Sequence, residues 1–139
     1  MKTIDSVLRS NADGSGDPGT AGSSMAGRAS LDISAALDRV GGDADLLKEL
    51  ASIFIEDYPR QLKLIEEAIA AADWKTAERE AHGLKGAVAN FGAADAMEAA
   101  RKVEFAAREG RHSELPLLLR QVIEELVGVR RELDRFSES

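Results

Sequence analysis

The sequence from residue 81 to residue 92 reads Ala-His-Gly-Leu-Lys-Gly-Ala-Val-Ala-Asn-Phe-Gly. Most of these residues favour a helix, and His82 lies near its middle. A glycine inside a helix costs roughly 1 kcal/mol relative to alanine, so Gly83 and Gly86 together lower the local helix stability by about 2 kcal/mol. The two glycines therefore indicate that the structure or the function needs space around His82.

Apolar residues recur at steps of three and four in three other segments, which is the pattern of one buried helix face. In residues 44–72 they are Leu47, Leu50, Phe54, Tyr58, Leu62, Ile65 and Ile69. In residues 93–109 they are Met97, Ala100, Val103 and Ala107. After Ser113 they are Leu115, Leu119, Val122, Leu126, Val129, Leu133 and Phe136. The last series is unbroken and is the strongest helical signal in the chain.

Residues that begin and end helices separate these segments. Asp43 and Asp73 are placed to cap the helices that follow them, and Gly92 and Gly110 are placed to end the helices before them. A short helix is expected over residues 32–40, ahead of two glycines. The connections between the long helices are therefore predicted to be short.

No segment alternates with a period of two for long enough to predict a strand. We therefore expect an all-α fold, an antiparallel four-helix bundle with a short additional N-terminal helix. Pro59 predicts a kink or a restart near residues 56–59 of the second helix. If the turn at Asp73 is tight, antiparallel pairing brings residues 60–64 level with His82.

Residues 1–30 have a different composition from the rest of the chain. Glycine, serine, alanine and aspartate dominate from Ser10 to Ser30. Such a segment buries too little apolar surface to offset the entropy of ordering it, so it predicts a flexible tail or a linker to a preceding domain. An expression remnant is the alternative. The globular domain is expected to span residues 31–137.

The overall composition excludes several classes of protein. The chain has 139 residues, of which 44% are hydrophobic and 31% charged, as in a soluble globular protein. Its net charge of −7 opposes binding to nucleic acid or to an anionic membrane. It has no cysteine and no apolar run near the roughly 20 residues of a membrane span. We expect a cytoplasmic monomer.

His82 is predicted to face solvent. The inward face of its helix carries Ala77, Ala81, Leu84, Val88 and Phe91. At about 100° per residue, His82 lies roughly 140° from the centre of that stripe.

The outward neighbours of His82 are Glu78, Lys85, Gly86 and Ala89. Gly86 lies opposite the core, so helix packing does not explain it, whereas Gly83 lies to one side, where a neighbouring helix could come close.

An exposed neutral imidazole is a competent nucleophile at physiological pH and can take a phosphoryl group on a ring nitrogen. Lys85 would offer positive charge to the phosphoryl oxygens and disfavour protonation of His82. Glu78 would either favour that protonation or hold the ring by accepting a hydrogen bond from its other nitrogen. The sequence leaves both roles open.

Other candidate sites are weaker. His112 lies beside Gly110 in a predicted loop and is expected to be an exposed loop residue. Glu78 and His82 could offer two metal ligands, but the paired Glu-x-x-His motifs of a di-iron bundle do not occur. We therefore expect no metal site and no cofactor. No glycine-rich phosphate loop follows a strand, so nucleotide binding is not expected.

The run from Ala81 to Gly86, with Asn90-Phe91-Gly92-Ala93 after it, resembles the phosphoacceptor motif of histidine-containing phosphotransfer (HPt) domains. The resemblance extends over about residues 31–136. It implies a four-helix bundle in which His82 is phosphorylated, Lys85 lies beside the phosphoryl group and Gly86 keeps the approach open. One departure is Gly83, where the family more often has a larger or hydroxyl-bearing residue.

By this resemblance the chain is a phosphoryl carrier without catalytic activity of its own. Its expected partners are receiver domains of response regulators or of a hybrid histidine kinase, and Mg²⁺ is expected only in the receiver. The docking surface is expected around His82, Lys85, Gly86 and Ala89, with Glu78 at its edge and part of an adjacent helix. Two alternatives remain: the phosphoacceptor domain of a chemotaxis-type histidine kinase, and a helical adaptor bundle in which His82 has no role.

Overall fold

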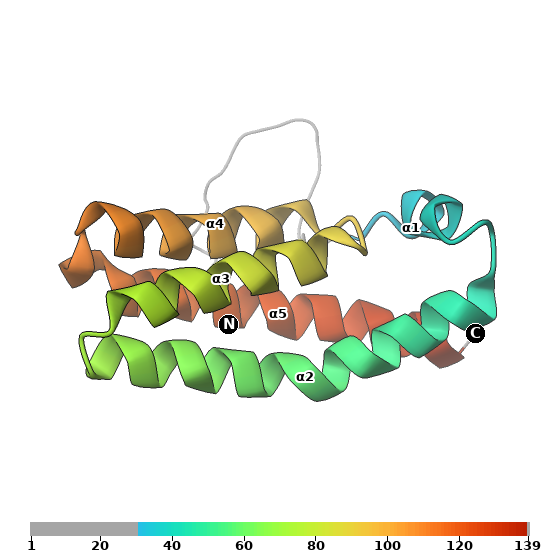
Figure 1. Cartoon of the computed structure of the whole chain (residues 1–139). Helices are drawn as coiled ribbons and strands as arrows, with labels where there is room; N and C mark the ends of the chain where they lie inside the picture. The colour runs from blue at the N-terminus through green and yellow to red at the C-terminus, as the bar shows by residue number, and fades with distance from the viewer. Residues whose placement is uncertain (1–30, 139) are drawn as a thin grey trace.

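The computed structural model describes residues 31–138, and all of its regular structure there is helical (Figure 1). The elements in chain order are α1 (Ile33–Arg39), α2 (Ala44–Ala70), α3 (Trp74–Ala89), α4 (Ala94–Glu109), the short 3-10 helix η1 (His112–Glu114) and α5 (Leu115–Glu138). The predicted all-α class is therefore confirmed. The predicted flexible tail over residues 1–30 lies outside the described residues.

Aspartates begin the first three helices. Asp43 accepts a hydrogen bond from the Leu46 N–H at 3.0 Å, and Asp73 accepts one from the Thr76 N–H at 3.2 Å. Such caps satisfy backbone donors that the first turn of a helix leaves unpaired. Asp32 caps α1 in the same way. The two caps predicted from the sequence are confirmed.

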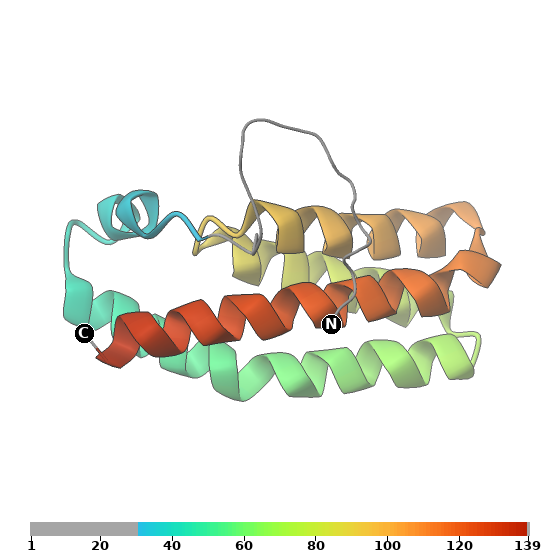
Figure 2. The same cartoon turned by 180° about the vertical axis from the view of Figure 1, so that it is seen from behind.

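The four long helices lie side by side and enclose one core (Figures 1 and 2). The helix α3 packs against α2 and α4, and α5 packs against the same two helices. Every apolar residue predicted to face inward on α3 is buried, and so are the first six of those on α5. No helix of the described part is both long and apolar enough to cross a membrane.

Two predictions about inward-facing residues are wrong. Leu50 on α2 and Met97 on α4 are exposed, and the neighbouring alanines Ala51 and Ala96 are buried in their place. The other residues predicted to face inward on α4, and Leu47, Phe54, Tyr58 and Ile65 on α2, are buried, so the predicted faces hold and an alanine completes each of them at one position.

Pro59 lies inside α2 without ending it. The helix is continuous from Ala44 to Ala70, so the alternative of a restart near residues 56–59 is wrong. Its axis bends near the middle in both views, where the colour passes from teal to green (Figures 1 and 2). A bend is the expected response to a residue that lacks one backbone donor and crowds the preceding turn.

The helix α1 is tied to the loop between α3 and α4. The Asp32 N–H donates to the Phe91 carbonyl at 3.1 Å, and Arg39 Nη1 donates to the Ala89 carbonyl at 2.7 Å. The Leu31 N–H also donates to Glu132 on α5 at 3.3 Å. The short N-terminal helix is therefore fixed to three parts of the domain, close to the C-terminal end of α3.

Candidate functional site

The buried face of α3 determines where His82 points. Ala77, Ala81, Leu84 and Val88 are all buried in the core. His82 follows Ala81 by about 100° around the helix, and its side chain is 67% exposed. The imidazole is therefore accessible to a macromolecule.

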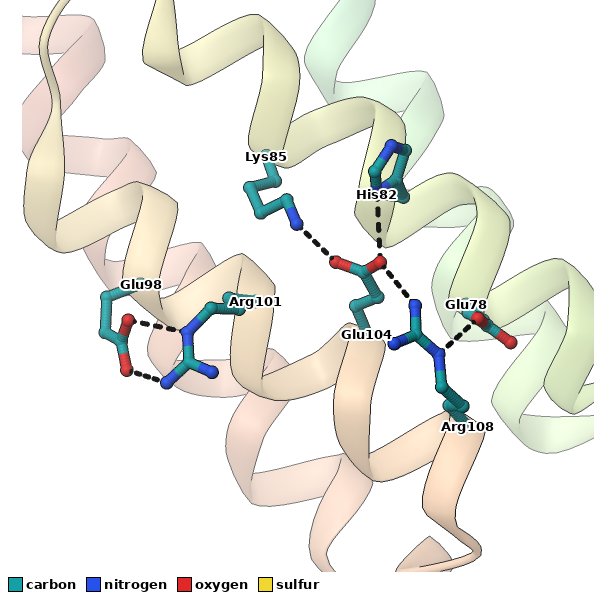
Figure 3. Close-up of polar contacts among 7 residues, drawn as sticks. All are labelled: Glu78, His82, Lys85, Glu98, Arg101, Glu104 and Arg108. Carbon is teal, nitrogen blue, oxygen red and sulfur yellow. Dashed lines mark hydrogen bonds and ion pairs between the residues drawn. The ribbon is translucent and has the colours of Figure 1, made fainter.

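A buried carboxylate from the neighbouring helix holds the imidazole. Glu104 on α4 is the buried charged residue of the described core, with a side chain only 3% exposed. Its Oε2 lies 3.0 Å from His82 Nδ1. Figure 3 shows the second ring nitrogen of His82 on the side of the ring away from Glu104. Glu104 therefore fixes one edge of the ring and leaves the other free.

Two cations accompany the buried carboxylate (Figure 3). Lys85 Nζ lies 2.8 Å from Glu104 Oε1, which is an ion-pair distance although the approach does not have the directional geometry of a hydrogen bond. Arg108 Nη2 donates to Glu104 Oε2 at 2.9 Å. Burial raises the pKa of Glu104, but the contacts with Lys85 and His82 outweigh it and lower the pKa overall. Glu104 is therefore a carboxylate at neutral pH.

The charge of Glu104 decides where the proton of a neutral His82 lies. A carboxylate can only accept hydrogen bonds, so the nitrogen that faces Glu104 must be the donor. Nδ1 of His82 accordingly carries the hydrogen, and Nε2 carries the lone pair. The nucleophilic nitrogen is the one that faces away from Glu104.

Glu78 does not hold the imidazole ring. Its Oε2 instead accepts a hydrogen bond from Arg108 Nε at 2.7 Å. The role that the sequence left open for Glu78 belongs to Glu104, which is 22 residues from His82 in the chain. Among residues 31–138, no group of three or more side chains that could hold a metal ion was found.

The remaining candidate residues lie along the outer face of α3. Lys85 is 25% exposed, and its ammonium group points to Glu104 (Figure 3). A Cβ atom added to Gly86 would meet no atom within 4 Å, so the surface there is open. Ala89 is half-buried, and its carbonyl accepts the hydrogen bond from Arg39.

Gly83 lies beside α2, as its position on the helix predicts. A Cβ atom added there would lie 3.5 Å from Gln61 Nε2, which is an ordinary contact distance. Gln61 belongs to the segment of residues 60–64 that was predicted to lie level with His82, and the contact agrees with that prediction at this one residue. A side chain at Gly83 would therefore contact α2, whereas a side chain at Gly86 would contact no other part of the domain within 4 Å.

Glu104 and Arg108 are functional candidates that the reasoning from sequence missed. One signal was available for Glu104, because it follows Ala100 by four residues and Val103 by one on the predicted inward face of α4. A carboxylate in such a place needs a cation or a hydrogen-bond donor from a neighbouring helix. For Arg108, which is half exposed, the sequence carries no comparable signal.

The expectation for His112 is wrong. The residue begins η1 and is half-buried, and its ring stacks on Trp74 with centroids 3.7 Å apart. Both rings border an open hollow at the N-terminal end of α3, beside Arg108 and Glu78. His112 is therefore packed against side chains from α3 and α4 and does not extend into solvent from a loop.

Comparison with protein families identifies the fold. The family model described as the Hpt domain matches residues 49–138, which is more than half of the chain. The chain belongs to the Hpt domain family. Comparison with curated proteins and with solved structures gave no match. The Hpt match begins within α2 and runs to the end of α5, and Hpt domains carry phosphoryl groups on histidine in phosphorelays.

Proposed function

We propose that His82 accepts a phosphoryl group from the phospho-aspartate of one receiver domain and passes it to the aspartate of another. The observation that carries this proposal is an exposed imidazole in an Hpt domain, with Nδ1 on a buried carboxylate and Nε2 free. The receiver would supply Mg²⁺ and the catalytic groups, and this chain would need no cofactor and have no catalytic activity of its own.

The transfer step balances without a separate acid or base on this chain. The Nε2 lone pair attacks the phosphorus of the acyl phosphate, an N–P bond forms, and the P–O bond to the aspartate breaks with its electrons on the aspartate carboxylate. The ring keeps its hydrogen on Nδ1 and becomes formally cationic. Glu104, whose Oε2 lies 3.0 Å from Nδ1, stabilises that cation. The reverse attack by a second aspartate restores the neutral ring.

The docking surface proposed for the receiver is the outer face of α3 around His82, Lys85, Gly86 and Ala89. Gly86 supports this choice because the space above it is empty. Lys85 pairs with Glu104 through its ammonium group, and its positive charge beside His82 supports the proposal that it stabilises the charge of the phosphoryl group. Glu78 lies at the edge of the surface through its pair with Arg108.

We further infer that the domain spans residues 31–137 and that its long helices form an antiparallel four-helix bundle. The contacts of Leu31, Asp32 and Arg39 with the rest of the domain support the N-terminal boundary. In Figure 1 the colours follow the chain from right to left along α2 and α4 and from left to right along α3 and α5. This alternation of direction supports the antiparallel arrangement. We also propose that the protein is monomeric and cytoplasmic.

Transfer of labelled phosphate from a phosphorylated receiver domain tests the function. We expect His82→Gln to take up no label, because an amide has no nucleophilic lone pair comparable to that of imidazole. His112→Gln is the matched control, since it removes the other of the two histidines, and it should be labelled like the wild type. Equal labelling of His82→Gln and wild type would refute the assignment of the site.

A further inference from the structure

Arg108 connects the carboxylate that holds His82 to a second carboxylate on α3. Its Nη2 lies 2.9 Å from Glu104 Oε2, and its Nε lies 2.7 Å from Glu78 Oε2 (Figure 3). The Glu104 oxygen that it contacts is also the one that accepts the hydrogen bond from His82 Nδ1. His82 and Arg108 therefore share one acceptor atom.

The carboxylate of Glu104 is held at both oxygens. Lys85 lies against Oε1, while Arg108 and His82 lie against Oε2. A carboxylate with one free oxygen could rotate and move away from the imidazole. Arg108 on α4 and Lys85 on α3 hold the carboxylate from two sides. The position of Oε2, and with it the direction of the hydrogen bond from His82 Nδ1, therefore does not depend on the imidazole alone.

Arg108 is itself held in place although it is not part of the core. Its guanidinium carbon lies 4.9 Å from the centre of the Phe105 ring, and Glu78 contacts it from α3, one turn before His82. The side chain is 49% exposed, and exposed ion pairs contribute little to stability. We therefore attribute to these contacts mainly the orientation of the guanidinium toward Glu104, and only a small part of the stability of the domain.

We propose that Arg108 is a positioning residue for His82, with Glu78 as its anchor. By holding Oε2 of Glu104 in place, Arg108 keeps the hydrogen of the imidazole on Nδ1 and the lone pair on Nε2. The relevance to phosphotransfer rests on the function proposed above. The tautomer of His82 can be measured on the protein without any phosphoryl donor.

The first test compares Arg108→Gln with Arg101→Gln by long-range ¹⁵N–¹H correlation spectra of the imidazole. Arg101 is the matched control because it lies on the same helix, and its guanidinium carbon is 5.0 Å from the centre of the same Phe105 ring. Its ion pair, however, is with Glu98 and not with Glu104. At about pH 8.5, where an ordinary imidazole is neutral, we expect Arg108→Gln to move the Nδ1 and Nε2 shifts of His82 toward each other. Glu78→Gln should move them in the same direction by less, and Arg101→Gln should leave them unchanged.

The second test measures the initial rate of phosphoryl transfer from a phosphorylated receiver. Arg108 acts on His82 only through Glu104, so the loss of its charged hydrogen bond should lower the transfer rate of Arg108→Gln by roughly 5-fold. Arg108→Lys should retain part of the wild-type rate. An ammonium group can pair with Glu104, but it lacks the planar set of N–H donors with which the guanidinium binds Glu104 and Glu78 at the same time. Thermal unfolding of each variant establishes that the fold is intact.

The outcomes separate the two proposals. Wild-type tautomer shifts in a folded Arg108→Gln variant, or equal changes in Arg101→Gln, would overturn the role of Arg108. A higher fraction of the Nδ1–H form in Arg108→Gln would also overturn it, since Arg108 would then compete with His82 for the shared oxygen. If the shifts change as expected but His82 accepts no phosphoryl group, the positioning role stands and the proposed function fails.

Discussion

The ionisation of Glu104 links the candidate site to the stability of the domain. Its pKa in the folded protein lies below the ordinary value of 4.5, because the contacts with Lys85 and His82 outweigh the effect of burial. The unfolded chain therefore binds the proton more readily than the folded one. The stabilisation from Glu104 is fully present above about pH 4.5 and is lost as the pH falls through the lowered pKa.

Glu104→Gln should remove this contribution. At pH 7 we expect the variant to lose about 1–3 kcal/mol of unfolding free energy, because a buried charged hydrogen-bond partner is gone while Lys85 and Arg108 can turn to solvent. The difference in unfolding free energy between wild type and variant should narrow as the pH falls below about 4.5, through the lowered pKa at which the wild-type carboxylate takes up its proton. Urea unfolding at several pH values measures this difference, and a difference that stays constant in acid would show that Glu104 is not the titrating group.

At the scale of the helix, Gly86 weakens α3 without a packing reason. A Cβ atom there would meet nothing within 4 Å, and the backbone has no positive φ. Gly86→Ala should therefore raise the unfolding free energy by about 0.5–1 kcal/mol, the usual difference between glycine and alanine in a helix. A lower urea midpoint would mean that the position carries strain that the structure does not show.

Gly86→Arg separates access from stability at the same position. The long side chain has room to extend into solvent, so the variant should unfold like Gly86→Ala to within about 0.5 kcal/mol. On the proposed function it should slow phosphoryl transfer by at least roughly 10-fold, because it crowds the approach to His82 and clashes at a well-packed interface are costly. If the variant transfers at the wild-type rate, the receiver does not dock over Gly86.

The helices themselves were largely predictable from the sequence, because the spacing of apolar residues depends only on the geometry of a single helix. The stripes on α3 and α5 and the caps at Asp43 and Asp73 follow from such local rules. Leu50 and Met97 were misplaced because the spacing gives the buried face only to within about one residue, and small alanines can complete it.

The candidate site was only half predictable. His82 and its orientation follow from the pattern of one helix, whereas Glu104 and Arg108 come from α4. Which turn of α4 lies level with His82 depends on the loop from Asn90 to Ala93 and on the packing of all the helices. No local pattern contains that information, and the sequence therefore offered Glu78, the carboxylate one turn away on the same face of the helix, for the role that Glu104 has.

For the whole molecule, the main question is whether α1 belongs to the folded unit, since the Hpt match begins only at residue 49. Gly92 provides a test, because it has a φ of +66° and a Cβ atom there would lie 2.5 Å from the Asp32 Cβ and 3.0 Å from the Asp32 backbone nitrogen. Gly110 has a similar φ of +81° but nothing within 4 Å. An alanine at either position bears the backbone strain, and only at Gly92 must it also displace the start of α1.

Gly92→Ala should therefore lose about 1–3 kcal/mol more unfolding free energy than Gly110→Ala, which is the usual cost of forcing extra volume into a packed contact. The displacement would also weaken the bond from Asp32 to the Phe91 carbonyl and loosen the cap that Arg39 places on the end of α3. Urea unfolding of the two variants beside the wild type measures the difference. Equal losses would show that α1 rests on the domain without stabilising it, and the functional unit would then begin with α2.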